Sequence, residues 1–172
     1  MPQVTRLLSE IFSDRPQRRI GRHIFAGGHA QPMLRQAAAL AIQTDDSNPR
    51  LLKITISNAG AGHSIPSGHG PRAIIVKLIL REANGREIAL PKYPDDTIAV
   101  YTVNPVLGGH TPFIEPAIRA GEIKELTVSL DGLPRGRYQV HVELWYDLDR
   151  TVAWNDKDLP LMTEAMTTVN FP

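Results

Sequence analysis

The fold is decided by the stretch YQVHVELWY at residues 138–146, in which apolar and polar side chains alternate without a break. In an extended chain, one face of this stretch carries Tyr138, Val140, Val142, Leu144 and Tyr146. The other face carries Gln139, His141, Glu143 and Trp145. A period of two residues is typical of a strand with one buried face. The stretch therefore predicts a long strand over a β core, with His141 on its outer face in a structural role.

Similar alternation recurs on both sides of this strand. Further strands are predicted over residues 50–58, 73–81, 87–90, 97–103, 123–130 and 166–171. The pair Asn84-Gly85 is typical of a hairpin turn, and residues 131–136 provide a second turn. About seven short strands, with helices confined to the front of the chain, indicate a mainly β fold, an immunoglobulin-like β-sandwich preceded by a short helical N-terminal segment. Residues 136–140 (GRYQV) also resemble the tyrosine-bearing strand start common in such sandwiches.

The front of the chain has a different pattern. Apolar residues at helical spacing predict a short amphipathic helix over residues 3–13, and a basic linker follows over residues 15–22. A second, strongly apolar helix is expected to open at Pro32, since proline is tolerated in a first turn, and to run through Ile42. We therefore predict an N-terminal helical and linker segment over residues 1–48 and a β-sandwich domain over residues 49–172.

Composition excludes several classes of protein. The 172 residues are 42% apolar, which is enough to bury a core, and carry a formal net charge of +1. Such a small charge argues against a nucleic-acid-binding or membrane-surface role. No apolar run approaches the length of a membrane span, and no signal peptide is visible. The chain has no cysteine, which excludes disulfides, thiolate zinc sites and covalent attachment of a c-type haem.

Charge is nevertheless unevenly distributed. Residues 1–35 hold six arginines against two acids, and residues 143–164 hold six acids against two bases. One interpretation is a pair of solvated faces. The other is a basic segment that docks on carboxylates, such as those of an acidic partner or of haem propionates.

Three histidines stand where the backbone is sharply turned. His63 lies in GAGHSIPSG at residues 60–68, a Gly-rich and Pro-braced loop that follows a predicted strand. His23 and His29 lie in RHIFAGGH at residues 22–29. Imidazole is the commonest metal ligand in proteins, so these positions suggest a metal or haem site. The alternative for each is a structural histidine that bonds backbone groups of its own loop.

Motifs for catalysis are missing, and we predict that the chain is not an enzyme. The loop acids at residues 95–96 and 156–158 do not have the spacing of a paired acid and base. The chain has no nucleophile elbow, no phosphate-binding glycine loop and no His-Glu-x-x-His motif. No motif supports a Ca²⁺ site in an acidic loop either. A small metal-dependent hydrolase built on the histidines is the weakest alternative.

Two phrases in this order resemble the C-terminal part of multihaem c-type cytochromes. They are HIFAGGH at residues 23–29 and NAGAGHSIPSG at residues 58–68, with Met33-Leu34 in an Ala-rich helix between them. That family has a His-x-Phe-x-Gly-x-His phrase after its last haem-attachment motif, then a Gly-His-x-x-Pro-Thr-Gly loop and a β-sandwich. The resemblance covers roughly residues 1–82. The chain departs from the family at Ser67, where threonine is usual, and in having no Cys-x-x-Cys-His.

The resemblance implies the non-haem tail of a split, truncated or incompletely defined multihaem cytochrome. Haem c would be held by a partner chain or an upstream segment, because this chain cannot attach it. His23, His29 and His63 are the implied distal haem ligands. The resemblance also places a basic cluster against the haem propionates, formed by Arg18, Arg19 and Arg22.

We therefore expect an accessory subunit or domain of an electron-transfer assembly, which covers a haem and supplies an axial histidine to it. Its partner would be a multihaem cytochrome subunit in a hetero-oligomer, and its location periplasmic or extracellular by resemblance. The alternative is a haem-free immunoglobulin-like module that binds a protein or a glycan, with purely structural histidines.

Overall fold

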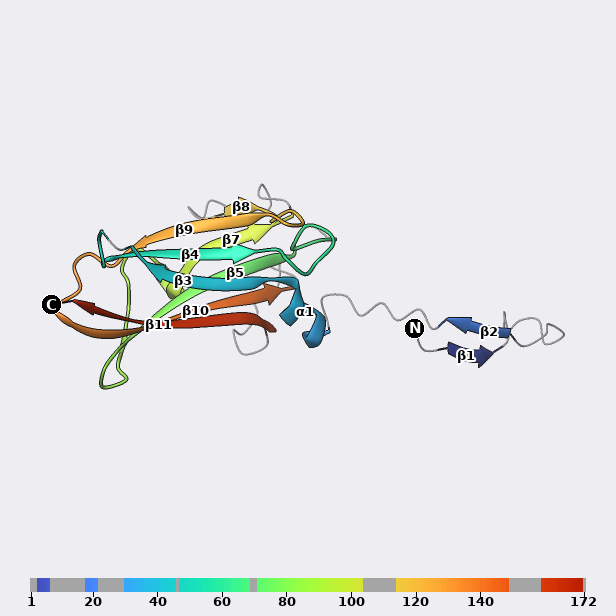
Figure 1. Ribbon diagram of the computed structural model, residues 1–172, viewed down its shortest axis with the longest axis horizontal. Helices are drawn as coiled ribbons and strands as arrows, with labels where there is room; N and C mark the ends of the chain where they lie inside the picture. The colour runs from blue at the N-terminus through green and yellow to red at the C-terminus, as the bar shows by residue number, and fades with distance from the viewer. Residues whose placement is uncertain are drawn as a thin grey trace.

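The structure is a computed structural model, and its described residues from residue 30 onward form two stacked β-sheets (Figure 1). It describes residues 30–45, 47–68, 71–103, 114–148 and 159–171, together with the backbone of residues 3–6 and 18–21. One sheet has six strands and the other has three. The predicted mainly β sandwich with a short helix near its front is confirmed.

The larger sheet is antiparallel except at one edge. Its strands follow the order β11-β10-β5-β7-β8, and β6 pairs with the end of β5. Their bounds are β5 (Ala73–Glu82), β6 (Glu87–Ile88), β7 (Thr97–Thr102), β8 (Ile114–Pro116), β10 (Gly136–Asp147) and β11 (Leu161–Phe171). A short 3-10 turn, η1 (Pro94–Asp96), precedes β7. The edge strand β8 pairs with β7 in parallel, and the sequence did not predict it.

The smaller sheet has the order β3-β4-β9, with bounds β3 (Ala39–Thr44), β4 (Leu51–Ser57) and β9 (Ile123–Ser129). Both of its pairings are antiparallel. β11 of the larger sheet packs against β3, which brings the two sheets together along one side of the sandwich.

The core lies between the sheets and follows the alternation of the strands. Leu52, Ile54 and Ile56 of β4 are fully buried and meet the inward side chains of β5, including Val76 and Leu78. On β10, the face predicted to be inward is buried at every position, from Tyr138 to Tyr146. Tyr138 also donates a hydrogen bond from its hydroxyl to Pro134 O at 3.0 Å, which fixes the start of the strand.

The predicted helix over residues 32–42 is wrong in its second half. The helix α1 (Gln31–Ala37) ends after two turns, and Ala38 is extended at φ −134°, ψ 151°. From Ala39 the chain forms β3, in which Leu40 and Ile42 pack on the core. Pairing with β4 overrides the helix propensity of the alanines and leucines, because the open edge of β4 offers hydrogen bonds and a core-facing surface. The sandwich thus includes residues from the segment before residue 49.

The helix predicted over residues 3–13 is also wrong where the chain is described. Residues Gln3–Arg6 form β1, which pairs antiparallel with β2 (Arg18–Gly21). β-branched residues on both strands favour this hairpin, and ladder pairing replaces the local helix. Residues 7–13 lie outside the described residues.

Figure 1 shows α1 and the β4–β5 connection at one end of the sandwich and the C terminus at the other. Gln31 Nε2 donates a hydrogen bond to Leu161 O, which ties α1 to β11. Within the described residues, no helix has the length and apolar character that crossing a membrane requires.

Candidate functional site

A pocket opens where α1 meets the connection between β4 and β5, and we call it the helix–loop pocket. Its volume is about 400 Å³, within the range of small-molecule sites. The lining is largely apolar and includes Met33, Leu34 and Ala37 of α1, Ala61 and Ile65 of the loop, and Met162 of β11. The polar groups are His63, Ser67, Arg72 and Tyr146, with Gln36 at the helix. This is the arrangement expected for an amphipathic ligand with one acidic end.

Buried polar contacts fix the loop that carries His63. Asn58 is 1% exposed and donates from Nδ2 to His63 O at 2.8 Å and to Ile118 O at 3.0 Å. Ile65 and Ile118 exchange two backbone hydrogen bonds of 2.8 Å, and the peptide bond before Pro66 is cis. The loop is therefore anchored on both sides of His63.

Gly60 lets the loop approach the helix closely. A Cβ at this position would lie 1.6 Å from Gln36 O, where no side chain fits. The Gly60 N–H donates to Ala37 O at 3.3 Å, so the end of α1 is satisfied by the loop. The glycines that mark this loop in the sequence thus have unequal roles, since a Cβ on Gly62 would meet nothing within 4 Å.

The His63 ring is exposed, but one of its nitrogens is occupied. Nδ1 lies 2.9 Å from Ser64 O, and because a carbonyl only accepts, Nδ1 carries the proton. This tautomer leaves the lone pair on Nε2 available. Metal-ligating histidines commonly donate their second ring N–H in this way, which sets the ring orientation. His63 therefore presents an imidazole in the form that binds a metal.

Arg72 provides the positive charge of the pocket. Its Nη1 donates to Ser67 O at 3.0 Å, and its guanidinium also bonds Tyr146. Gly68, at φ +93°, makes room for this side chain, since a Cβ there would lie 2.7 Å from Nη1. Burial raises the pKa of Tyr146, and the bond from Arg72 opposes that rise. Arg72 retains further N–H groups for an anionic ligand.

Of the residues predicted from the sequence, His63 is placed in the pocket. His23, His29 and Arg22 lie outside the described residues. Arg18 and Arg19 belong to β2, of which the backbone is described. The structure therefore does not test the roles of these five residues. Arg72 and Tyr146 were not predicted as site residues, because their approach depends on the register of β5 and β10.

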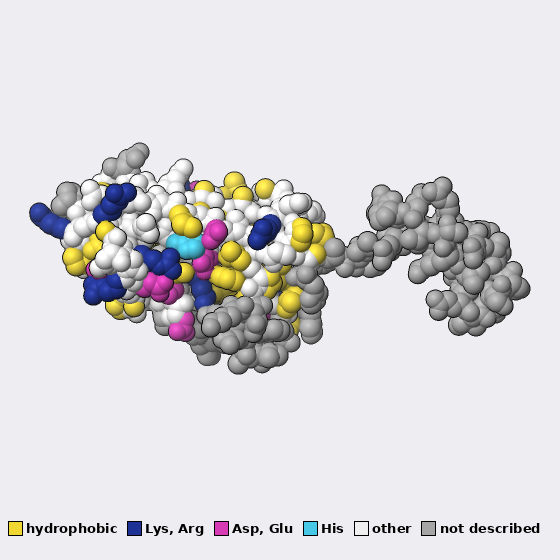
Figure 2. Space-filling model, turned by 90° about the horizontal axis from the view of Figure 1, so that it is seen from below, with side chains coloured by type: hydrophobic (Ala, Val, Ile, Leu, Met, Phe, Trp, Pro, Cys, Tyr) yellow, Lys and Arg dark blue, Asp and Glu magenta, His cyan; other side chains and the backbone are white. Residues whose placement is uncertain are grey.

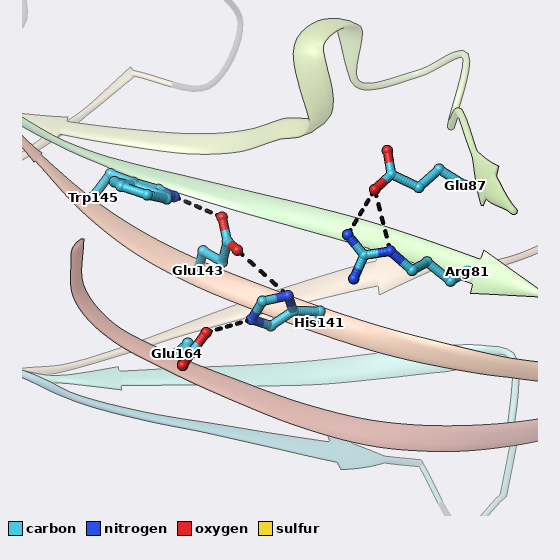
Figure 3. A network of polar contacts seen from close by, with 6 residues as sticks. All are labelled: Arg81, Glu87, His141, Glu143, Trp145 and Glu164. Atoms are coloured by element: carbon cyan, nitrogen blue, oxygen red, sulfur yellow. Dashed lines mark hydrogen bonds and ion pairs between the residues drawn. The ribbon is translucent and has the colours of Figure 1, made fainter. Parts of the chain in front are cut away.

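A second group of polar residues lies on the outer face of the larger sheet, and we call it the His141 cluster: His141, Glu143, Trp145 and Glu164. Figure 3 shows the His141 ring between the two carboxylates. Nε2 lies 2.8 Å from Glu164 Oε2, and Nδ1 lies 3.4 Å from Glu143 Oε1. His141 was predicted on the outer face, and it is, but it is 9% exposed. The alternation at residues 138–146 was the available signal, whereas Glu164 required the β10–β11 register.

Comparison with known proteins adds one finding on the fold. No protein-family model matches the chain, and no curated protein sequence matches it. Among solved structures, the fold is similar to that of a penta-heme cytochrome c552 from Thermochromatium tepidum, with a TM-score of 0.57 and 19% sequence identity. The match covers 83% of this chain and 42% of that chain, so this chain spans less than half the length of that cytochrome. The fold therefore occurs within a multihaem cytochrome.

Proposed function

We propose that the chain is an accessory part of a multihaem c-type cytochrome assembly, in which it covers a haem held by another chain or segment. His63 Nε2 is the axial ligand that it donates. The observation that carries this proposal is the His63 ring, oriented through Nδ1 at the edge of an apolar pocket that contains Arg72. Without cysteine, the chain contributes protein contacts and a ligand to the haem, not its attachment.

The pocket suits the edge of a porphyrin. Its walls are apolar, and Met33 at its rim is 54% exposed, as expected for a side chain that a partner covers. Arg72 would pair with a propionate, since guanidinium groups bind carboxylates in a bidentate manner. Bound haem supplies one-electron transfer, and its potential depends on axial ligand, burial and nearby hydrogen bonds. The axial ligand would be His63, the burial would come from the apolar walls, and the nearby hydrogen bonds would come from Arg72.

The similarity to a penta-heme cytochrome supports this proposal at the level of fold. The phrases around His23 and His63 support it from the sequence. A periplasmic or extracellular location and a hetero-oligomeric assembly belong to the same proposal and rest on the resemblance alone.

The test uses the full 172-residue chain and a haem c peptide that carries its own proximal histidine and an open sixth position. We expect mixing to give a low-spin, bis-imidazole absorbance spectrum. His63→Ala should abolish that spectrum. Arg72→Gln should keep it but weaken binding about tenfold, because one charge-assisted contact is lost.

Gly62→Ala is the matched control within the loop, since a Cβ there meets no atom, and it should bind like the wild type. His23→Ala and His29→Ala complete the series. Loss of the low-spin spectrum in one of these, with His63→Ala unchanged, would overturn the ligand role of His63. No low-spin spectrum on mixing the wild-type chain with the peptide would leave a haem-free binding module as the function.

A further inference from the structure

The His141 cluster lies on the outer face of the larger sheet, away from the helix–loop pocket. His141 pairs with Met166 of β11 and Ile79 of β5 across the ladder, and it is 9% exposed. Figure 2 shows a histidine beside acidic and apolar side chains on the molecular surface. A nearly buried imidazole with carboxylates on two sides needs a chemical explanation, because buried polar groups are normally satisfied.

Glu164 accounts for one ring nitrogen. Its Oε2 lies 2.8 Å from His141 Nε2, a good hydrogen-bond distance, and the carboxylate accepts. In the neutral imidazole, the proton therefore resides on Nε2 and the lone pair on Nδ1. A carboxylate that accepts from one nitrogen of a histidine while the other nitrogen binds a metal is the usual outer contact of metal sites.

The other nitrogen is buried and has no hydrogen-bond partner among the described residues. Glu143 Oε1 lies 3.4 Å from His141 Nδ1, too far for a normal hydrogen bond. Two ligands of a tetrahedral Zn²⁺ ion, each about 2.0–2.1 Å from it, are about 3.3 Å apart. Trp145 Nε1 donates to the other oxygen, Glu143 Oε2, at 2.8 Å and so holds the carboxylate in place. Figure 3 shows this chain of contacts.

We propose that His141 Nδ1 and Glu143 Oε1 bind a divalent transition-metal ion, with Zn²⁺ as the best fit, and that Glu164 positions the imidazole. The ligand atoms of His141, Glu143 and Glu164 lie within 4.8 Å of one another. Imidazole with carboxylate suits Zn²⁺ better than Ca²⁺ or Mg²⁺, which prefer oxygen ligands alone. Water or a group of a partner would complete the coordination. The site is independent of the proposed haem contact.

The test is equilibrium dialysis of the full chain against Zn²⁺ after chelator treatment, with thermal unfolding and tryptophan emission as second readouts. We expect bound Zn²⁺ to raise the unfolding temperature and to change the emission of Trp145, which contacts Glu143. Glu143→Gln and His141→Gln should each lose one equivalent of Zn²⁺. Glu164→Gln should retain it with affinity weakened about 10–100-fold, as for other outer contacts of metal sites.

Glu125→Gln is the matched control, since Glu125 lies on β9 of the other sheet and pairs with Lys53 at the surface. It should bind Zn²⁺ like the wild type. Glu143→Gln keeps the size of the side chain, and circular dichroism checks that it folds. Full Zn²⁺ binding by a folded Glu143→Gln, or no binding by the wild type, would overturn the proposal.

Discussion

His63 and His141 show how the same side chain acquires different chemistry in two regions of one sandwich. His63 is exposed on a loop, and a carbonyl occupies its Nδ1, so that Nε2 keeps the lone pair. His141 is nearly buried on a strand, and a carboxylate occupies its Nε2, so that Nδ1 faces a second carboxylate. Both rings are oriented by a bond to one nitrogen.

The two sites differ in what surrounds the second ring nitrogen of each histidine. His63 lines a largely apolar pocket with one arginine, which suits a large and anionic cofactor edge. Nδ1 of His141 borders a carboxylate fixed by Trp145, which suits a small cation. In the two proposals, the local charge around an oriented imidazole would select the ligand.

Gly60→Ala should have the largest effect on stability, and the clash that causes it lies at the helix–loop pocket. The added methyl would overlap the Gln36 carbonyl, a backbone atom that cannot rotate away. We expect the free energy of unfolding in guanidinium to fall by about 3 kcal/mol. Gly62→Ala should change it by less than about 0.5 kcal/mol. Equal midpoints for the two variants would show that the contact between loop and helix is not required.

Asn58→Ala should have an intermediate effect on the same region. It leaves His63 O and Ile118 O without the donor that they share, in a buried setting. We expect a loss of about 2 kcal/mol in the free energy of unfolding and a weaker haem-peptide spectrum, while Zn²⁺ binding at the His141 cluster is unchanged. Asn84→Ala, at an exposed turn, is the control and should cost less than about 1 kcal/mol. A comparable loss of Zn²⁺ binding in Asn58→Ala would mean that the two regions are coupled.

The smallest expected effect is a change in the pKa of one buried tyrosine. Burial raises the pKa of Tyr101 to about 12, with Glu115 and Glu122 adding to the rise. Arg72→Gln removes the bond that opposes the rise in the pKa of Tyr146. Absorbance titration near 295 nm should show Tyr146 ionising at higher pH in this variant and Tyr101 unchanged. Tyr146→Phe identifies which transition belongs to Tyr146. An unchanged pKa of Tyr146 in Arg72→Gln would show that Arg72 does not contact its hydroxyl.

The raised tyrosine pKa values also set the sign of the pH dependence of stability. An unfolded tyrosine ionises near pH 10, so above that pH the unfolded chain binds fewer protons than the folded chain. The stability contributed by a neutral, buried Tyr101 is complete below pH 10 and is lost as pH rises towards about 12. Tyr101→Phe should therefore lose less stability than the wild type between pH 9 and 11, measured by denaturant unfolding.

Periodicity in the sequence was sufficient for most strands. The inward face of β10 was predicted residue by residue, because alternation in an extended chain depends only on backbone geometry. Local propensity could not distinguish helix from strand at residues 39–44. Pairing with β4 makes this segment a strand. His63 was selected as a candidate because glycine and proline around a histidine mark a turned backbone, and the structure places it at a pocket.

The residues alone were enough to predict a two-sheet core, to exclude thioether attachment of haem to this chain and to select His63 as a candidate ligand. The three-dimensional arrangement was needed to show that Arg72 and Tyr146 join His63 in one pocket, and that Glu164, 23 residues away, reaches His141. Alternation is a local property of the chain. Which side chains meet across strands depends on register and on the packing of the whole sandwich.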